Sequence, residues 1–251
     1  MLRRPTAQAA GWLLGGVTVG LQVCYPLTRG RRREAVSIAT VATFSAATLV
    51  HTAAARGAAA VGRLLTVAVA ALGVEAVGVR TGVPFGRYHY TGRLGPRLAG
   101  VPAVVPLAWV MMTGPALAAS RRLARGRTGR AVLATAALAS WDLFLDPQMV
   151  ADGNWEWDTK GPALQGIPLT NYAGWVAVSA ALTQLATPAA PVQPERDALP
   201  VTLYLWTYLG SVLANAAFLR RPAVAVSGGI GMGLVAIPLL RDTLRRAGAG
   251  R

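Results

Sequence analysis

The chain has 251 residues, of which 53% are apolar and only 14% are charged, whereas about 25% of the residues of a soluble domain are charged. The formal net charge is +15, but the arginines fall in short clusters between apolar runs, a pattern that fits membrane topology and anionic lipid headgroups better than a DNA-binding surface. The single cysteine, Cys24, excludes an intramolecular disulfide and a cysteine-based metal site. We therefore predict an integral membrane protein.

The first apolar run begins after Arg3 and Arg4. It continues for about twenty residues, which is too long for the apolar core of a signal peptide and long enough for a membrane span. We expect this run to form the first transmembrane helix.

Eight segments in all have the apolar character of a membrane span, for which about 20 residues are needed. They are 9–28, 35–55, 64–79, 101–119, 131–148, 168–187, 199–219 and 223–240. The expected fold is all-α, a polytopic transmembrane helix bundle of about eight spans, and we treat residues 1–251 as a single integral membrane domain. Gly229 and Gly233 form a GxxxG motif in the last segment, which indicates close helix packing.

Two long loops, 80–100 and 149–167, interrupt this pattern, and a proline-rich linker at 188–198 has the composition of a plain surface connection. Because successive spans alternate in direction, both long loops fall on the same side of the membrane, opposite the N-terminus. Lysine and arginine are nearly balanced between the two sides, so the positive-inside rule only weakly favours a cytoplasmic N-terminus.

The first long loop, TGVPFGRYHYTGRLGPRLAGVP, interleaves aromatic residues with the glycines and prolines of successive turns. Such a loop suits a lid folded onto an apolar ligand, because irregular backbone near the membrane is tolerated where it lines a cavity. The alternative is a belt of aromatic residues at the membrane interface. The second long loop has a similar composition. In it, Trp155 and Trp157 fit a belt, and we expect Asp152 and Glu156 to face water.

The stretch WDLFLDPQMV places Asp142 and Asp146 four residues apart in an otherwise apolar segment. Four residues make about one helical turn, so both carboxyl groups should lie on one face, and charges at membrane depth usually face a bundle interior or a cavity. Pro147 disfavours helical geometry at the preceding residue. We therefore expect the helix to end at Asp146, where the partly negative helix end would help a carboxyl group to keep its proton. The alternative is an aspartate that bonds loop amides or pairs with an arginine.

Other polar groups of the predicted spans converge at the same depth. Glu75 lies about four residues, or about 6 Å, from the end of its span on the side of the long loops. The spans that contain Trp109, Asn171 and Trp175 start from that side. This convergence is the main indication of a functional site. His51 lies near the opposite side, and we interpret it as a capping or interfacial residue rather than a catalytic one.

Several common chemistries lack their motifs. No Walker A or dinucleotide-binding glycine pattern follows a predicted strand, and the two histidines are too far apart in sequence for a convincing metal site. Polyprenyl-diphosphate enzymes of membranes typically hold magnesium with aspartate-rich clusters, but Phe144 and Leu145 separate the two acids here, and there is no second cluster. No serine or cysteine nucleophile with a nearby base is evident. The remaining carboxylic acids, aromatic rings and amides suit acid–base chemistry on a lipophilic substrate.

Several sequence blocks occur in the order found in a known family. PFGRYHY, LGPRLAGVP, VPLAWVMM, WDLFLDPQMV, GNWEW and GIPLTNYAGW resemble the signature blocks of the membrane carotenoid-biosynthesis protein family, which includes carotenoid 1,2-hydratases of cyanobacteria and haloarchaea that act on γ-carotene and on a C50 bacterioruberin precursor. The resemblance covers about residues 75–175, while the outer spans match only in hydropathy. It implies carotenoid biosynthesis and the hydration of an acyclic carotenoid, either lycopene-like or a C50 precursor, without a cofactor.

Hydration of a terminal isoprenoid double bond requires a proton on the less substituted carbon and water on the tertiary cation that forms beside it. From this chemistry we predict Asp146 or Asp142 as the general acid and Glu75 as the group that positions or deprotonates water. Aromatic faces would stabilise the cation. The predicted substrate-binding residues are Trp109, Trp141, Tyr88, Tyr90, Asn171, Tyr172 and Trp175. We predict no metal ion.

Other functions remain open. A cyclase or isomerase of the same pathway would form the same cation and quench it by proton loss, whereas a carotenoid-binding or scaffolding membrane protein would perform no chemistry. A transporter is a third possibility, although the chain lacks the repeats or paired interrupted helices that transporters often show. The expected location is the cell membrane, as a multi-pass protein of a bacterial inner membrane. The expected partners are membrane lipids and other carotenoid enzymes, and no nucleic acid.

Overall fold

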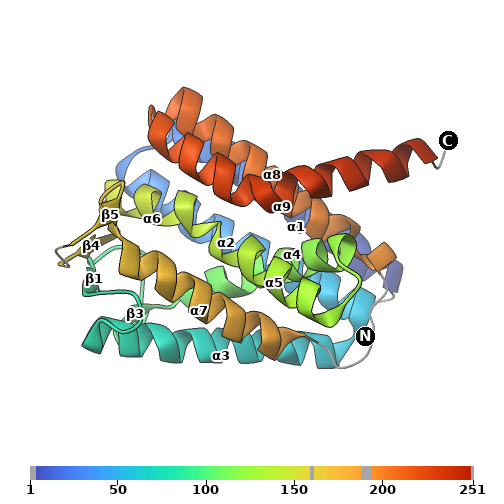
Figure 1. Ribbon diagram of the computed structural model, residues 1–251, viewed down its shortest axis with the longest axis horizontal. Helices are drawn as coiled ribbons and strands as arrows, with labels where there is room; N and C mark the ends of the chain where they lie inside the picture. Colours follow the sequence, from blue (N-terminus) through green and yellow to red (C-terminus); the bar gives the residue numbers. More distant parts are fainter. Residues whose placement is uncertain (1–3, 159–160, 188–193, 250–251) are drawn as a thin grey trace.

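The computed structural model describes residues 4–158, 161–187 and 194–249. Long helices run side by side along the long axis of the molecule, and the short strands gather at one end (Figure 1). The helices are α1 (Arg4–Cys24), α2 (Gly30–Arg56), α3 (Ala58–Thr81), α4 (Val104–Leu123), α5 (Arg127–Ala139), α6 (Asp142–Ala151), α7 (Leu169–Ala186), α8 (Ala198–Leu213) and α9 (Pro222–Ala249). The short 3-10 helices are η1 (Tyr25–Leu27) and η2 (Pro194–Asp197), and the π-helix η3 (Ala214–Phe218) continues α8. The predicted helical bundle is thus confirmed.

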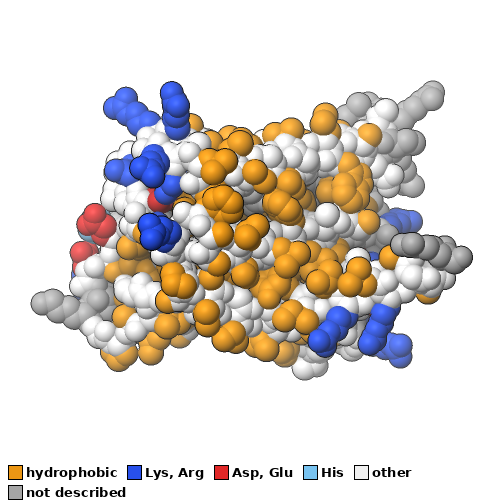
Figure 2. Space-filling model, turned by 90° about the horizontal axis from the view of Figure 1, so that it is seen from above, with side chains coloured by type: hydrophobic (Ala, Val, Ile, Leu, Met, Phe, Trp, Pro, Cys, Tyr) orange, Lys and Arg blue, Asp and Glu red, His pale blue; other side chains and the backbone are white. Residues whose placement is uncertain are grey.

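Within the residues that the structure describes, five helical segments are long and apolar enough to cross a membrane. They are Thr6–Leu27, Gly30–Arg56, Ala58–Thr81, Ala198–Phe218 and Pro222–Ala249. Helices α4 to α7 are not among them, so the predicted count of about eight spans is not confirmed. Figure 2 shows apolar side chains over the middle of the molecule and arginine side chains toward its two ends. Exposed apolar residues as large as Leu13, Val69 and Leu234 fit a surface that faces lipid.

The predicted span 131–148 is not a single helix. Helix α5 ends at Ala139, α6 begins at Asp142, and the two residues between them form a turn. The prediction that Pro147 ends the helix at Asp146 is also wrong, because α6 continues through Pro147 to Ala151. Proline cannot donate a helical hydrogen bond, but burial of residues on both sides of it keeps the turn in place. Asp142 therefore lies in the first turn of α6, where a helix favours negative charge, and Asp146 lies within the helix.

The two long loops pair with each other through a short antiparallel ladder. Strand β1 (Tyr88–Tyr90) from the first loop pairs with β4 (Trp155–Trp157) from the second, with Tyr88 opposite Trp157 and Tyr90 opposite Trp155. Since side chains alternate along a strand, Tyr88, Tyr90 and Trp155 point into the molecule, and the central residue of each strand is exposed.

Two further pairs of two-residue strands fold the rest of these loops. Strand β2 (Arg97–Leu98) pairs with β3 (Val101–Pro102), and β5 (Ala163–Leu164) pairs with β6 (Ile167–Pro168). We call the described residues of 82–103 and 152–168 the cap, because they cover one end of the helix bundle (Figure 1).

Side chains and close contacts fix the cap to the bundle. Asp152 accepts hydrogen bonds from the Tyr25 hydroxyl and from Arg33 Nη1, the latter at 2.8 Å. Helix α7 approaches the first loop so closely that a Cβ atom on Gly174 would lie 2.8 Å from the Pro84 carbonyl oxygen. The cap therefore packs directly on the helices.

Glycines of α9 allow two other close contacts. A Cβ atom on Gly233 would lie 3.0 Å from the Tyr208 hydroxyl of α8, so the predicted GxxxG motif does lie at a close helix contact. The closest contacts of α9 glycines are made outside this motif. Gly228 lies against the Phe144 side chain of α6, and Gly231 lies against the Leu143 side chain of the same helix. Helix α6, which carries both predicted acids, is thereby held against α9.

The predicted linker 188–198 lies partly outside the described residues. Its described part is not a plain surface connection, because it forms η2 and ends at Ala198, the first residue of α8. Asp197 at the end of η2 is completely buried. An isolated buried carboxylate is costly, so the interpretation as a surface linker is wrong for this part of the chain.

Candidate active site

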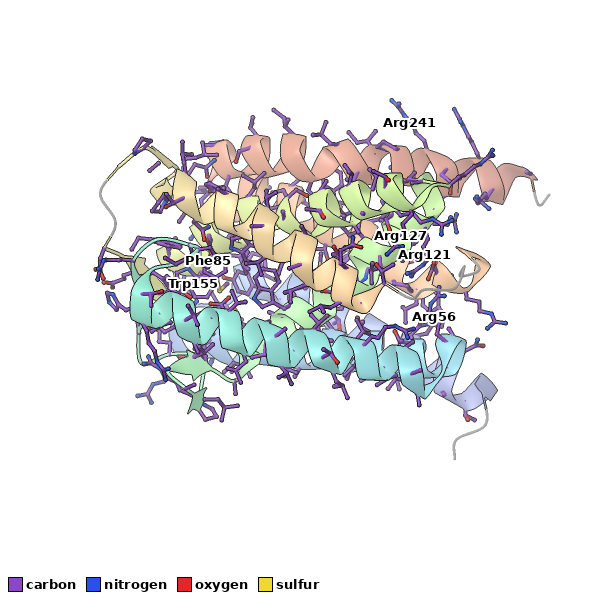
Figure 3. All side chains as sticks on the ribbon, turned by 60° about the horizontal axis from the view of Figure 1, so that its bottom comes forward. Arg56, Phe85, Arg121, Arg127, Trp155 and Arg241 are labelled. Carbon is purple, nitrogen blue, oxygen red and sulfur yellow. The ribbon has the colours of Figure 1, made fainter. Side chains whose placement is uncertain are left out.

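A cavity of about 330 Å³ lies at the strand-bearing end of the molecule, between the cap and the bundle. Figure 3 shows Phe85 and Trp155 close together at this end. Most of the lining is apolar or aromatic, and α3, α4, α6, α7 and the cap all contribute to it. We call it the aromatic cavity. Its polar and aromatic lining includes Glu75, Phe85, Tyr88, Tyr90, Trp109, Trp141, Asp146, Trp155, Trp157, Asn171 and Trp175.

Glu75 of α3 is buried at the centre of a set of neutral donors. Its Oε2 atom accepts hydrogen bonds from the hydroxyls of Tyr88 at 2.6 Å and Tyr90 at 2.8 Å. Its Oε1 atom accepts one from the Trp109 Nε1 atom at 3.0 Å. An ionised carboxyl group only accepts hydrogen bonds, so three converging donors match an ionised Glu75. The length of α3 places this residue six positions before the helix ends at Thr81, somewhat deeper than predicted.

The two tyrosines keep their protons in this arrangement. Burial, followed by the neighbouring Glu75 carboxylate, raises the pKa of Tyr88 and of Tyr90 above the ordinary value of 10.0. Both residues lie in β1 of the cap. They therefore remain hydrogen-bond donors over the whole neutral and mildly alkaline range.

Asp142 and Asp146 form a buried pair that is bridged by one amide. The Asn171 Nδ2 atom donates to Asp142 Oδ2 at 2.8 Å and to Asp146 Oδ2 at 2.5 Å. Both aspartates are almost completely buried, and no ion pair joins either of them to a cationic side chain in the described part of the chain. Two buried carboxylates that share one amide donor would repel each other if both were ionised, so the pair is more stable when it holds a proton.

Aromatic rings that contact one another form part of the cavity wall. Trp109 and Trp175 stack with their centroids 4.1 Å apart and an interplanar angle of 21°. Trp141 meets Trp175 edge-on at 6.0 Å. The faces of such rings carry partial negative charge and attract cations. The cavity thus combines an apolar volume, aromatic faces and two kinds of carboxyl environment.

The structure brings eight of the ten predicted site residues to the lining of this cavity. They are Glu75, Tyr88, Tyr90, Trp109, Trp141, Asp146, Asn171 and Trp175. Asp142 is not part of the lining but contacts it through Asn171. Tyr172 is not part of the lining either, and its hydroxyl lies 3.4 Å from the Leu164 carbonyl oxygen of β5.

Other lining residues were not predicted. Trp155 and Trp157, which fitted an interfacial belt, face the cavity through β4. The segments YHY and WEW alternate as strands do, but three residues are too few to predict this pairing from the sequence. Trp206 of α8 also lines the cavity, and the sequence carries no signal for it. As expected, Glu156 faces water, with 63% of its side chain exposed, whereas Asp152 pairs with Arg33.

Among the residues that the structure describes, no three His, Cys, Asp or Glu side chains come together as a candidate metal-binding group. The cavity is built instead from neutral donors and carboxyl groups.

Comparison with known proteins identifies the family of this chain. Residues 34–236 match the family described as carotenoid biosynthesis protein. The chain belongs to this family. The match extends well beyond residues 75–175 and takes in most of α2, all of α8 and the first half of α9, while α1 lies outside it. Membership supports a role in carotenoid biosynthesis.

A curated relative shares part of this sequence. Bisanhydrobacterioruberin hydratase of Haloarcula japonica is 38% identical over 109 residues, which are 41% of this chain and 36% of that protein. The match therefore spans about a third of the relative's length. No solved structure matches the chain.

Proposed function

We propose that this protein hydrates the terminal C1,C2 double bond of an acyclic carotenoid end group and forms a tertiary alcohol. The observation that carries the proposal is the amide-bridged pair of Asp142 and Asp146 in the same apolar, aromatic cavity as the neutral-donor site of Glu75. The family and the partial identity to a hydratase support the same reaction.

In the proposed reaction, the carboxyl group of Asp146 gives its proton to C2, the less substituted carbon. The electrons of the double bond form the new C–H bond and leave a tertiary cation at C1. The oxygen of a water molecule then bonds to C1, and the water loses one proton to Glu75. The product has gained one water, and the enzyme returns to its starting state when Glu75 passes that proton back within the shared cavity.

The different surroundings of the carboxyl groups support these roles. Asp146 lines the cavity and shares its amide donor with a second carboxyl group, which favours a proton on the pair. Glu75 meets three neutral donors, which favours the ionised form that deprotonates water. Paired acid and base roles commonly rest on two carboxyl groups in different surroundings. Asp142 and Asn171 hold the acid in position.

The aromatic wall suits the cationic intermediate. The stacked rings of Trp109 and Trp175 line the cavity that also holds Asp146. A cation within about 6 Å of such a ring face is stabilised. A site of this kind needs no metal ion to stabilise positive charge on carbon.

The same cavity suggests how a long polyene is accommodated. Its lining includes Leu27 of η1 together with Leu213 and Phe218 of α8 and η3, all of which are exposed on the apolar surface. We propose that the end group lies near Asp146 while the rest of the polyene passes between η1 and η3 into the lipid. The π-helix geometry of η3, frequent at functional sites, lies at this exit. The protein would act as a single multi-pass domain, residues 1–251, of the cell membrane.

The test is pigment mass spectrometry of a lycopene-producing bacterial host that expresses the chain. The wild type is expected to yield products one or two waters heavier than lycopene, and Asp146→Asn is expected to yield none. Glu156→Gln, which changes an exposed cap carboxylate, is the matched control and should behave as the wild type.

A C50 precursor is the second substrate to supply in the same assay. New pigments of unchanged mass would point to a cyclase or isomerase. If both substrates are recovered unaltered while pigment copurifies with the protein, hydration is refuted and a carotenoid-binding role takes its place.

A further inference from the structure

A second cavity, of about 230 Å³, lies at the end of the bundle opposite the cap. Figure 3 shows Arg56 and Arg121 at this end, far from Phe85 and Trp155 at the other. The end of α2, the start of α3, the end of α4 and the start of α8 surround it. We call it the basic cavity, and its charged and titratable lining residues are His51, Arg56, Arg63, Arg121, Arg196 and Asp197.

The charges of the basic cavity do not balance. Among the described residues, four guanidinium groups and one carboxylate line it, which is an excess of three positive charges within that set. Asp197 accepts from Arg56 Nη2 at 2.5 Å and from Arg121 Nε at 2.8 Å, so this carboxylate is already shared by two arginines. Arg63 forms no ion pair within the described part of the chain.

Two buried nitrogen atoms of the basic cavity have no hydrogen-bond partner among the described residues. They are Arg63 Nε and His51 Nδ1. His51 is 8% exposed, and its Nε2 atom lies 2.9 Å from the Arg196 carbonyl oxygen. Because a carbonyl oxygen only accepts, Nε2 carries a proton, and Nδ1 is free to accept from or donate to a ligand. A buried charged donor without a partner is costly, and a bound anion would remove that cost at Arg63.

We propose that the basic cavity binds a phosphate group. Guanidinium groups bind phosphate oxygens in a bidentate manner, and the first turn of α3, which begins at Ala58 and contributes Ala60 to the lining, adds the positive end of a 24-residue helix. The cavity lies where membrane-length helices α2 and α3 end and begin, which is the depth of lipid headgroups. Basic pockets between membrane helices commonly bind anionic lipids.

A purely structural role explains only part of this site. The Asp197 ion pairs tie η2 to α2 and α4 through Arg56 and Arg121. Arg196 donates to the Ala55 carbonyl oxygen. Neither interaction uses Arg63 or the Nδ1 atom of His51. A phosphate ligand would explain why Arg63 and His51 face this cavity.

The experiment measures the unfolding temperature of the full chain after delipidation in a neutral detergent. The ligands are dioleoylphosphatidylglycerol, dioleoylglycerol with the same acyl chains and no phosphate, inorganic phosphate, and sodium chloride at matched ionic strength. A saturable increase with phosphatidylglycerol alone identifies a lipid headgroup as the phosphate source. An equal, saturable increase with inorganic phosphate identifies free phosphate.

Arg63→Gln is expected to raise the half-saturating ligand concentration about tenfold, the cost of one lost charged hydrogen bond. The control Arg127→Gln removes the same charge from an exposed position at the same end of the molecule, and it should change that concentration less than about twofold. Arg196→Gln is the second variant if Arg63→Gln does not fold. The proposal is overturned if neither phosphate compound stabilises the wild type beyond sodium chloride, or if the cavity variants and Arg127→Gln respond alike.

Discussion

Buried carboxyl groups have different partners at the two ends of the molecule. At the end away from the cap, Asp197 forms ion pairs with Arg56 and Arg121 and so joins η2 to α2 and α4. At the cap end, Glu75 and the aspartate pair meet only neutral donors, namely tyrosine, tryptophan and asparagine.

This difference separates structural acids from chemically active ones. A carboxylate that is neutralised by two guanidinium groups has little tendency to exchange protons. Buried carboxyl groups without a cationic partner change protonation state more readily, and perturbed groups of this kind gather at functional sites. The variants below test whether the two ends differ in the way that this comparison requires.

The largest expected effect is on activity at the cap end. Asp146→Asn should lower the rate of hydration by roughly 10²–10⁴-fold, the usual contribution of a general acid. The variant should fold, because asparagine fills the same volume and keeps a polar contact to Asn171. Product formation per quantity of membrane-inserted protein measures the effect. A variant that retains more than about a tenth of the wild-type rate would exclude Asp146 as the acid.

The corresponding change at the other end should affect stability instead. Asp197→Asn leaves Arg56 and Arg121 without their buried counter-charge, and breaking a buried ion pair in this way costs about 3–5 kcal/mol. Unfolding of the purified protein in detergent measures this loss. Activity per folded molecule should remain unchanged, and a selective loss of activity in a stable protein would contradict the division between the two ends.

A smaller effect is expected when one neutral donor to Glu75 is removed. Tyr90→Phe deletes a 2.8 Å hydrogen bond to the buried carboxylate, a bond type that contributes about 1.5–3 kcal/mol, so activity should fall at least tenfold. The control is Tyr172→Phe, whose hydroxyl makes only a 3.4 Å contact with an exposed carbonyl oxygen. Comparable losses in both variants would show that Tyr172 also belongs to the site.

Packing of the cap on α7 gives a further test. Gly174→Ala places a methyl group 2.8 Å from the Pro84 carbonyl oxygen, and overpacking of this kind costs about 1–3 kcal/mol. We expect weaker substrate binding, measured as a higher KM, because the cap that lines the aromatic cavity must move. Gly16→Ala, where nothing lies within 4 Å, is the matched control and should leave KM unchanged.

The smallest effect concerns pH. The folded protein raises the pKa of Tyr88 and Tyr90, whereas in the unfolded chain these phenols ionise near pH 10. The unfolded state therefore binds fewer protons than the folded state above about pH 10, and stability falls as pH rises beyond that value. The free energy of unfolding, measured at a series of pH values above about 10, should decrease less steeply with pH in a variant that carries both Tyr88→Phe and Tyr90→Phe. An identical slope would show that the two phenols ionise normally.

The sequence predicted the convergence of the candidate site but not its local geometry. Alternation of apolar segments was enough to bring Glu75, Asp146 and Asn171 to one end. The helix end predicted from Pro147 was wrong, because packing of α6 against α9 outweighs the local preference of proline. The turn between α5 and α6 was not predicted from the sequence either. The three-residue strands β1 and β4 are too short for a periodic signal, so Trp155 and Trp157 could not be placed.

The basic cavity was also beyond sequence reasoning. Arg56 and Arg121 are 65 positions apart, and Asp197 stands in a stretch whose proline-rich composition resembles a linker. Only the packing of α2, α4 and η2 shows that these charges meet. His51 was expected to be a capping or interfacial residue, and its bond to the Arg196 carbonyl oxygen agrees with that interpretation.

The antiparallel pairing of β1 with β4 couples two loops that are more than 60 residues apart in the chain. Release of either loop breaks the same backbone ladder, so the two cannot open independently. A ligand held behind Tyr90 and Trp155 therefore leaves on that side only when the whole ladder separates. Access through the cap therefore depends on one cooperative opening of the ladder rather than on the motion of two separate loops.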